Sequence, residues 1–122
     1  MDELAEGVRG PERLRVYHLA QDLATSVDRI ARASARHGNI ADQLRRSAES
    51  IVLNIAEGAG HYSPGRKIYH YQLARGSAAE CIAALTHLQR RKPSEMITSS
   101  RRSANMISAM LTALIHSLET RR

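Results

Sequence analysis

Apolar residues recur at alternating spacings of three and four in four separate segments of this chain, and this pattern constrains the fold more than any other feature. In the first segment the repeating positions are Val16, Ala20, Leu23, Val27 and Ile30. Such spacings return to one face of an α-helix, whereas a strand alternates every second residue. The pattern therefore predicts four amphipathic helices and no strand.

The predicted helices are separated by short segments rich in Gly, Pro and Ser. We expect helices over residues 13–36, 40–57, 64–91 and 94–120, preceded by a mobile leader, residues 1–12, that lacks periodic apolar positions. Connections this short force each helix to return antiparallel to the one before it. The prediction is an all-α, antiparallel up-down-up-down four-helix bundle formed by residues 13–122.

Several residues are suited to begin or end these helices. Asn39 is expected to cap the second helix, because its side chain can accept a hydrogen bond from a free backbone N–H. Gly58 and Gly60 should terminate that helix. Ser63 as N-cap and Pro64 at the first helical position should start the third helix.

Two residues inside the third helix have a distinct expected role. Gly76 is predicted either to permit a close helix crossing or to be a tolerated weakness in the helix. Cys81, the single cysteine, cannot form an internal disulfide and lies in a strongly apolar segment. We interpret it as a core residue rather than a reactive thiol.

Length and composition agree with a single helical bundle outside membranes. A chain of 122 residues without Trp or Phe must build its core from aliphatic side chains and four Tyr, and one core is all that this length supports. No apolar run of 18 residues is present, and the acidic opening is unlike a signal peptide. We therefore expect a cytoplasmic protein that does not engage a membrane.

The charge of the chain is positive and unevenly distributed. The formal net charge is +6, but four of the acidic residues fall in the first twelve positions, and the remaining chain holds 17 basic and 8 acidic residues, a charge of +9. A field of this sign attracts polyanions. Two clusters are candidates for nucleic-acid binding through phosphate contacts and ring stacking, with a solvated basic face as the alternative. They are Arg66, Lys67 and Tyr69, and Arg90, Arg91, Lys92, Arg101 and Arg102.

Polar residues also interrupt the apolar helices. Facing helices could bring them together, because a buried charge needs a partner. We interpret them as a structural polar layer that sets helix register, with a ligand site as the alternative. The residues are Arg45, Asn54, Glu57, Ser77 and Glu80.

No motif for catalysis, a metal or a cofactor is recognisable. A bridged di-metal site on a bundle needs Glu-x-x-His pairs, and here His61 follows Glu57 by four residues across two glycines. Cys and His residues lack the spacing of zinc sites. The chain also lacks a phosphate-binding glycine loop and a glycine-framed nucleophile turn. We therefore predict no enzyme activity, no metal and no cofactor.

Some apolar residues lie outside the main stripes, which is more apolar surface than a monomeric bundle of this size requires. We expect these residues to contact further copies of the chain. The predicted oligomer interface comprises Val52, Leu53, Leu73 and Leu111.

Two sequence blocks resemble a known family. Residues 43–51, QLRRSAESI, are followed by NIAEG at 54–58, and the third helix carries LARGSAAE at 73–80. These blocks resemble the signatures of the 23S rRNA intervening-sequence four-helix-bundle proteins, and the resemblance is specific over residues 43–88. It implies a bundle that assembles into a ring-shaped homopentamer without known catalytic activity. Related bundles are accessory variability determinants of diversity-generating retroelements, in which a basic pentamer engages reverse transcriptase and RNA.

Two hypotheses for function follow. The first is a non-enzymatic basic bundle that binds nucleic acid, expected to be RNA, as an oligomer with little reading of bases. The alternative is a protein-interaction scaffold or accessory subunit that docks a partner such as a reverse transcriptase.

Overall fold

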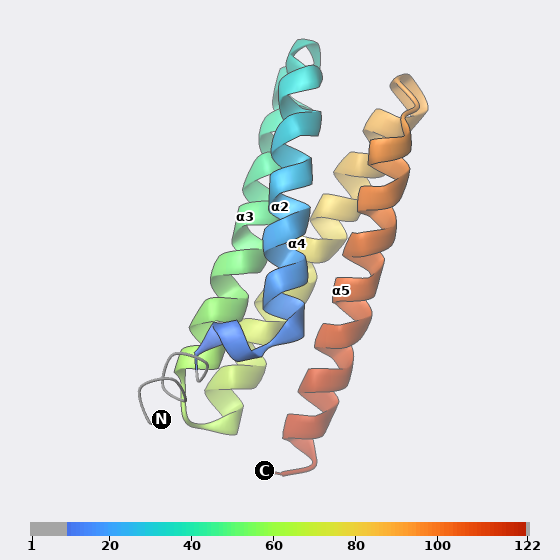
Figure 1. Ribbon diagram of the computed structural model, residues 1–122. Helices are drawn as coiled ribbons and strands as arrows, with labels where there is room; N and C mark the ends of the chain where they lie inside the picture. Colours follow the sequence, from blue (N-terminus) through green and yellow to red (C-terminus); the bar gives the residue numbers. More distant parts are fainter. Residues whose placement is uncertain (1–9, 122) are drawn as a thin grey trace.

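The computed structural model describes residues 10–121, and its regular elements are helical throughout that range (Figure 1). The prediction of an all-α fold with four main helices is confirmed. Two single turns of 3₁₀ helix, η1 and η2, precede and follow the first long helix. The elements are η1 Pro11–Arg13, α2 Arg15–Ala33, η2 Ala35–His37, α3 Gly38–Gly60, α4 Pro64–Arg91 and α5 Glu95–Glu119.

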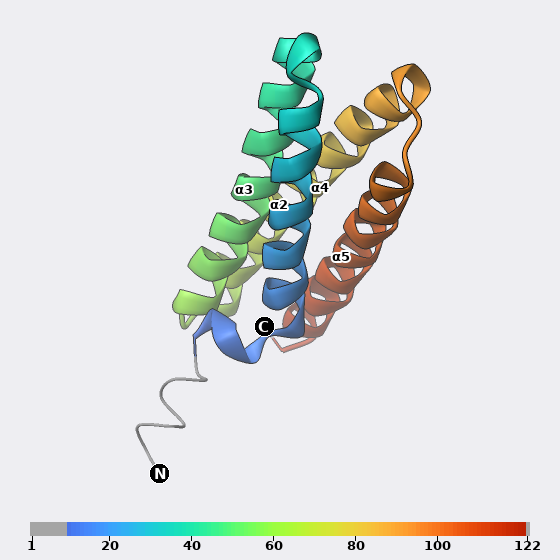
Figure 2. The same cartoon turned by 45° about the horizontal axis from the view of Figure 1, so that its top comes forward.

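The four helices pack as two hairpins that close against each other. α2 and α3 form one hairpin, α4 and α5 form the other, and α3 packs on α4 while α2 packs on α5. We call the end with the α3–α4 turn, η1 and the end of α5 the lower end, and the end with the α2–α3 and α4–α5 turns the upper end (Figure 1). The two hairpins diverge toward the upper end, most clearly in Figure 2.

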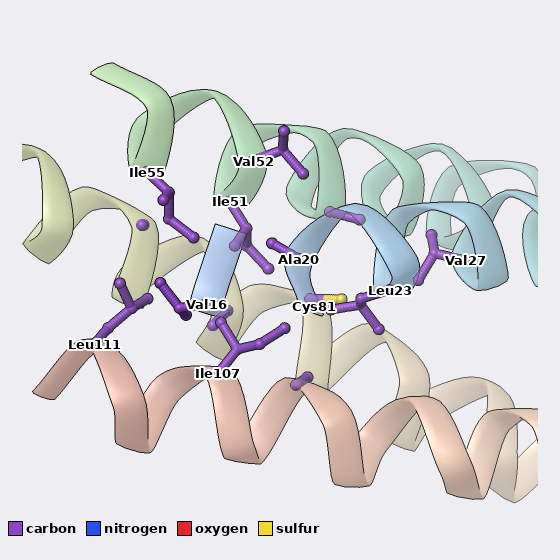
Figure 3. Packing of buried hydrophobic residues seen from close by; sticks show 14 of the residues in the cluster. Val16, Ala20, Leu23, Val27, Ile51, Val52, Ile55, Cys81, Ile107 and Leu111 are labelled. Carbon is purple, nitrogen blue, oxygen red and sulfur yellow. The ribbon is translucent and has the colours of Figure 1, made fainter. Parts of the chain in front are cut away.

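The core contains the stripe predicted for the first helix, together with Leu111, which lies off the predicted stripes. Figure 3 shows Ile107 and Leu111 pointing from α5 into the space between the other helices, toward Val16. Ile51, Ile107 and Leu111 have no exposed surface, and Val16 keeps only 4%. Burying an aliphatic side chain of this size contributes about 1.5–3 kcal/mol. The stripes are therefore the main source of stability.

The ends of α3 differ from the prediction. Asn39 does not cap the helix, because α3 already begins at Gly38 and no side chain caps its first turn. Gly58 does not terminate it either, since the helix continues to Gly60, which is its last residue. A Cβ on Gly58 would lie 2.6 Å from Cε1 of the buried Tyr71. Gly58 is therefore the glycine that allows a close approach of two helices.

Gly76 does not serve a close crossing. It is exposed on α4, and a Cβ at this position would meet nothing within 4 Å. The close contact between α3 and α4 depends on Gly58 instead. Of the two readings of Gly76, only the tolerated weakness agrees with the structure.

The start of the bundle also differs from the expected boundaries. The first nine residues of the predicted leader lie outside the described residues. Pro11–Arg13 form η1, so regular structure already begins within the predicted leader, and Leu14 packs against the core. The first long helix covers Arg15–Ala33 rather than 13–36, because the chain turns through η2 after Ala33. α4 coincides with the predicted range 64–91, and Ser63 caps it by accepting a hydrogen bond from the Arg66 N–H at 3.2 Å.

Candidate nucleic-acid interface

The first predicted basic cluster lies at the lower end, at the start of α4. Arg66 is exposed. The Lys67 ammonium donates hydrogen bonds to the carbonyl oxygens of Gly58 and Ala59, both at 3.2 Å, and so binds the last turn of α3. A cation is favoured at a helix C-terminus, where carbonyl groups lack helical partners. Lys67 therefore has a structural role in addition to its charge.

Two arginines that the sequence analysis did not select lie near Lys67. Burial lowers the pKa of Lys67, and the positive charges of Arg13 and Arg121 lower it further. Arg13 belongs to η1, and Arg121 follows the end of α5. A pocket of about 370 Å³ lies between Arg13, Tyr62 and Lys67. We call Arg13, Arg66, Lys67 and Arg121 the lower basic cluster. The up-down topology predicted from the sequence already implied that these chain segments share one end of the bundle.

Aromatic side chains adjoin the lower basic cluster. Tyr69 is 58% exposed, and Tyr62 in the α3–α4 turn is 99% exposed. The Tyr69 ring contacts the His70 ring edge-on, with a centroid distance of 5.1 Å and an interplanar angle of 79°. Exposed rings beside cations are the combination on which unpaired bases stack.

The second predicted cluster is at the upper end. Arg90, Arg91 and Lys92 are all exposed where α4 ends, and we call them the upper basic cluster. Lys92 and Arg29 of α2 border a common pocket of about 220 Å³, so Arg29 is a further cation that the sequence analysis missed. The 28 residues of α4 span about 40 Å, so the two clusters occupy opposite ends of the molecule.

Arg101 and Arg102 lie farther down α5 than the upper basic cluster. Arg102 is exposed, whereas Arg101 is partly buried and its Nε has no hydrogen-bond partner among the described residues. They begin about two turns after Glu95, where α5 starts. The structure thus does not gather all five predicted cations into one group.

Part of the predicted polar layer is present. The hydroxyl groups of Ser50 and Ser77 are 2.7 Å apart across α3 and α4. The Asn54 amide donates to the Ser50 carbonyl oxygen at 3.0 Å, and its Oδ1 lies 3.4 Å from Nδ1 of His70. Ser50 and His70, which the sequence analysis did not select, connect the two predicted residues Asn54 and Ser77.

The other three members do not join this network, and the prediction of one polar layer is wrong for them. Arg45 faces α2, where its Nε lies 3.5 Å from the Asp28 carboxylate. Glu57 and Glu80 are exposed, and Glu57 lies 3.9 Å from His61. The reason is helical geometry, because positions 45, 54 and 57 do not all point toward α4.

The predicted oligomer interface is divided between core and surface. Val52 and Leu111 are buried inside the single chain, with exposed fractions of 9% and 0%, and this corrects their assignment. Leu53 and Leu73 are exposed, at 66% and 41%. The spacing pattern could not reveal that Val52 and Leu111 fill the gaps between helices beside the main stripe.

Cys81 lies in the core of the bundle. Burial raises the pKa of Cys81 to about 11, so its thiol stays protonated near neutral pH, as expected of a core residue. Within residues 10–121, none of the helices combines the length and apolar character that crossing a bilayer requires.

The fold and its surface define a class: a basic four-helix bundle with cations at both ends and a polar seam between α3 and α4. Residues 12–113 match the family model of the 23S rRNA-intervening sequence protein, and the chain belongs to this family. The fold is similar to the crystal structure of a protein of unknown function from the S23 ribosomal protein family of Bacteroides thetaiotaomicron. That similarity has a TM-score of 0.75 at 22% identity and covers 82% of this chain and 97% of the other. No curated protein matches significantly.

Proposed function

We propose that this protein is a non-enzymatic RNA-binding bundle that acts as a homo-oligomer. The observation that carries the proposal is the pair of basic clusters. Among the described residues, none of the cations in the lower and upper basic clusters forms an ion pair with an acidic side chain. The description of the family refers to an intervening sequence of 23S rRNA, which is compatible with a nucleic-acid partner.

Arginines that form no ion pair with a described acidic residue suit contacts to phosphate. A guanidinium group can bind a phosphate with two parallel hydrogen bonds, and each phosphate neutralised releases counterions. Tyr62 and Tyr69 offer exposed rings for unpaired bases beside the lower basic cluster. Contacts of this kind favour binding to the backbone and to single-stranded segments, with little reading of sequence.

The exposed leucines support assembly of several subunits. Hydrogen bonds between Ser50 and Ser77, and between Asn54 and His70, join α3 and α4 on either side of the level of Leu53 and Leu73. Two large apolar side chains are therefore exposed at the same height of the α3–α4 pair. We propose that another subunit packs on these two leucines and that the assembly is a homopentamer. A closed ring would bring the basic clusters of its subunits into one field.

The test of RNA binding is its salt dependence. We expect affinity for a structured RNA with single-stranded loops to fall steeply between 50 and 200 mM salt. Replacing Arg90, Arg91 and Lys92 by Gln should reduce the slope of log K against log salt by about 2, at roughly 0.7 for each phosphate that is no longer neutralised. The charge-matched control replaces Arg15, Arg46 and Arg75 by Gln and should change the slope less. Absent or salt-independent binding by the unaltered protein would refute the proposal.

Assembly is tested by sedimentation. Leu53→Glu combined with Leu73→Glu should yield a single subunit, whereas Met106→Glu, which places the same charge at an exposed apolar position of α5, should leave the assembly intact. A lone unaltered subunit at micromolar concentration contradicts the oligomer.

The exposed Leu53 and Leu73 also favour a second candidate, a scaffold that docks a protein such as a reverse transcriptase. A stoichiometric protein partner that remains bound after nuclease treatment, and that Leu53→Glu releases, would support it over RNA binding.

A further inference from the structure

Three side chains with metal-binding atoms converge at the lower end of the α3–α4 pair. They are Glu57 of α3, His61 directly after α3, and His70 of α4. Each offers a carboxylate oxygen or an imidazole nitrogen, and these atoms lie within 4.8 Å of one another. Within residues 10–121 no other group of three such side chains converges in this way.

The convergence depends on the unexpected length of α3. Because the helix continues through Gly58 and Gly60, Glu57 and His61 are separated by one helical turn and lie on the same face. The spacing of four between Glu57 and His61, across two glycines, is not the Glu-x-x-His spacing of a di-metal site, so the sequence did not predict a metal here. It also could not foresee that α4 brings His70 to the same place.

The distances are close to those of a bound metal ion. The Glu57 carboxylate is 3.9 Å from Nε2 of His61, and the rings of His61 and His70 are stacked with a centroid distance of 5.1 Å. Ligand atoms at about 2.0–2.2 Å from a tetrahedral ion are roughly 3.2–3.6 Å apart. Rotation of the exposed Glu57 side chain and tilting of the two rings would close the difference.

Two further observations indicate a ligand site rather than a chance grouping. Nε2 of His61 is shielded from solvent and has no hydrogen-bond partner among the described residues. Nδ1 of His70 lies 3.4 Å from Oδ1 of Asn54, whose amide is in turn bound to Ser50. When Nδ1–H of His70 donates to Asn54, the Nε2 lone pair of the ring is available. Carbonyl oxygens commonly orient metal-binding histidines in this way.

We propose that Glu57, His61 and His70 bind a divalent transition-metal ion of the zinc class. Two imidazoles and one carboxylate match the ligand preference of this class and leave a fourth position open. Asn54 is the positioning residue for His70. The ion would join the end of α3 to the first turns of α4 and so stabilise the α3–α4 turn. The proposal of a metal site does not rest on the proposed RNA binding.

The experiment is calorimetric titration of the untagged full chain with Zn²⁺ at neutral pH. We expect one ion per chain with micromolar or tighter affinity. His61→Gln, His70→Gln and Glu57→Gln should each weaken binding by more than the roughly 10–100-fold that Asn54→Ala should cost by releasing His70. The matched control is His87→Gln, which removes an exposed histidine of α4 far from the site and should leave the affinity unchanged.

Folding does not obscure the outcome. Glu57 is exposed, so Glu57→Gln should leave the helical circular dichroism unchanged and test the site in a folded protein. Zn²⁺ should also raise the melting temperature of the unaltered protein but not that of the Glu57→Gln variant. No binding below millimolar Zn²⁺, or binding that all three ligand variants leave unchanged, would overturn the proposal.

Discussion

The two ends of the bundle are built differently. At the lower end Gly58 allows the Tyr71 ring to pack against α3, and Lys67 binds the last carbonyl groups of that helix. At the upper end the hairpins diverge (Figure 2), and a pocket of about 220 Å³ lies between Ile30 and Ile97. The pocket of about 370 Å³ at the lower end is not lined by core residues, whereas the upper pocket borders the buried Ile30 and Ile97. Close packing of the core therefore contributes more at the lower end, and local hydrogen bonds such as that from Gln89 to Thr98 contribute more at the upper end.

The largest expected difference between the ends is in the cost of a cavity. Ile55→Ala at the lower end removes a side chain with no exposed surface and should destabilise the protein by about 3–5 kcal/mol, the upper part of the range for such changes. Ile97→Ala at the upper end enlarges a pocket that already reaches the surface and should cost about 2–3 kcal/mol. Urea denaturation measures both, and equal costs would contradict the difference in packing between the ends.

Cys81 lies between the two ends and makes the free energy of unfolding depend on pH in the alkaline range. Burial raises its pKa from the ordinary 9.0 to about 11, while a hydrogen bond with Ser47 lowers it slightly. The folded state therefore holds the thiol proton more tightly. The free energy of unfolding is therefore unaffected by Cys81 below pH 9, where the thiol is protonated in both states. It falls by roughly 2–3 kcal/mol as the pH rises through about 11, because the unfolded chain loses the thiol proton first.

Cys81→Ala tests this dependence. The stability of the variant should fall less between pH 9 and 11 than that of the unaltered protein. Thiol labelling at pH 8 gives a second measurement. Labelling should be slow in the native protein. Faster labelling in Ile97→Ala would show that opening of the upper end exposes Cys81, and faster labelling in Ile55→Ala would show the same for the lower end.

The next largest change in stability should come from the contact between Gly58 and Tyr71. Gly58→Ala places a Cβ 2.6 Å from the Tyr71 ring and should destabilise the protein by about 1–3 kcal/mol. Gly76→Ala is the matched control, because its Cβ would meet nothing, and it should stabilise the helix by up to about 1 kcal/mol. Thermal melting distinguishes the two signs, and a neutral Gly58→Ala would show that α3 and α4 are free to move apart.

The smallest effects concern the serine caps. Ser63 and Ser94 each accept a hydrogen bond at 3.2 Å, from the N–H groups of Arg66 and Ile97 respectively. Substitution by Ala should cost about 1 kcal/mol. Ser94 is half-buried and Ser63 is exposed, so Ser94→Ala should be the more costly change. The reverse order in urea denaturation would indicate that the upper end does not depend on its local hydrogen bonds.

The fold could be predicted from the sequence because the patterns that indicate helices are local and repeated. Val16 and Ile107 recur within their stripes at helical spacing, and Ser63 with Pro64 marks a helix start by its own chemistry. The ends of the helices were harder to predict. Gly58 is a helix terminator in isolation, yet it lies inside α3, and the Tyr71 ring that packs against it belongs to a residue 13 positions away.

The candidate sites could be predicted from the sequence only in part. The cations of both basic clusters could be selected from composition, yet Arg13 and Arg121 were missed because their proximity to Lys67 joins three chain segments. Leu53 and Leu111 both lie off the main stripes, and periodicity cannot distinguish the exposed one from the buried one. The distinction depends on how the helices are rotated about their axes.

By itself the sequence determined four amphipathic helices, their order and the positive charge of the bundle, because these properties follow from residue spacing and composition along a short stretch of chain. Tertiary structure decided which polar groups meet. Glu57 and His61 become neighbours only because α3 continues to Gly60, and His70 joins them only because α4 packs antiparallel at that level. Contacts between helices depend on axial rotation and register, which side chains from several segments set together.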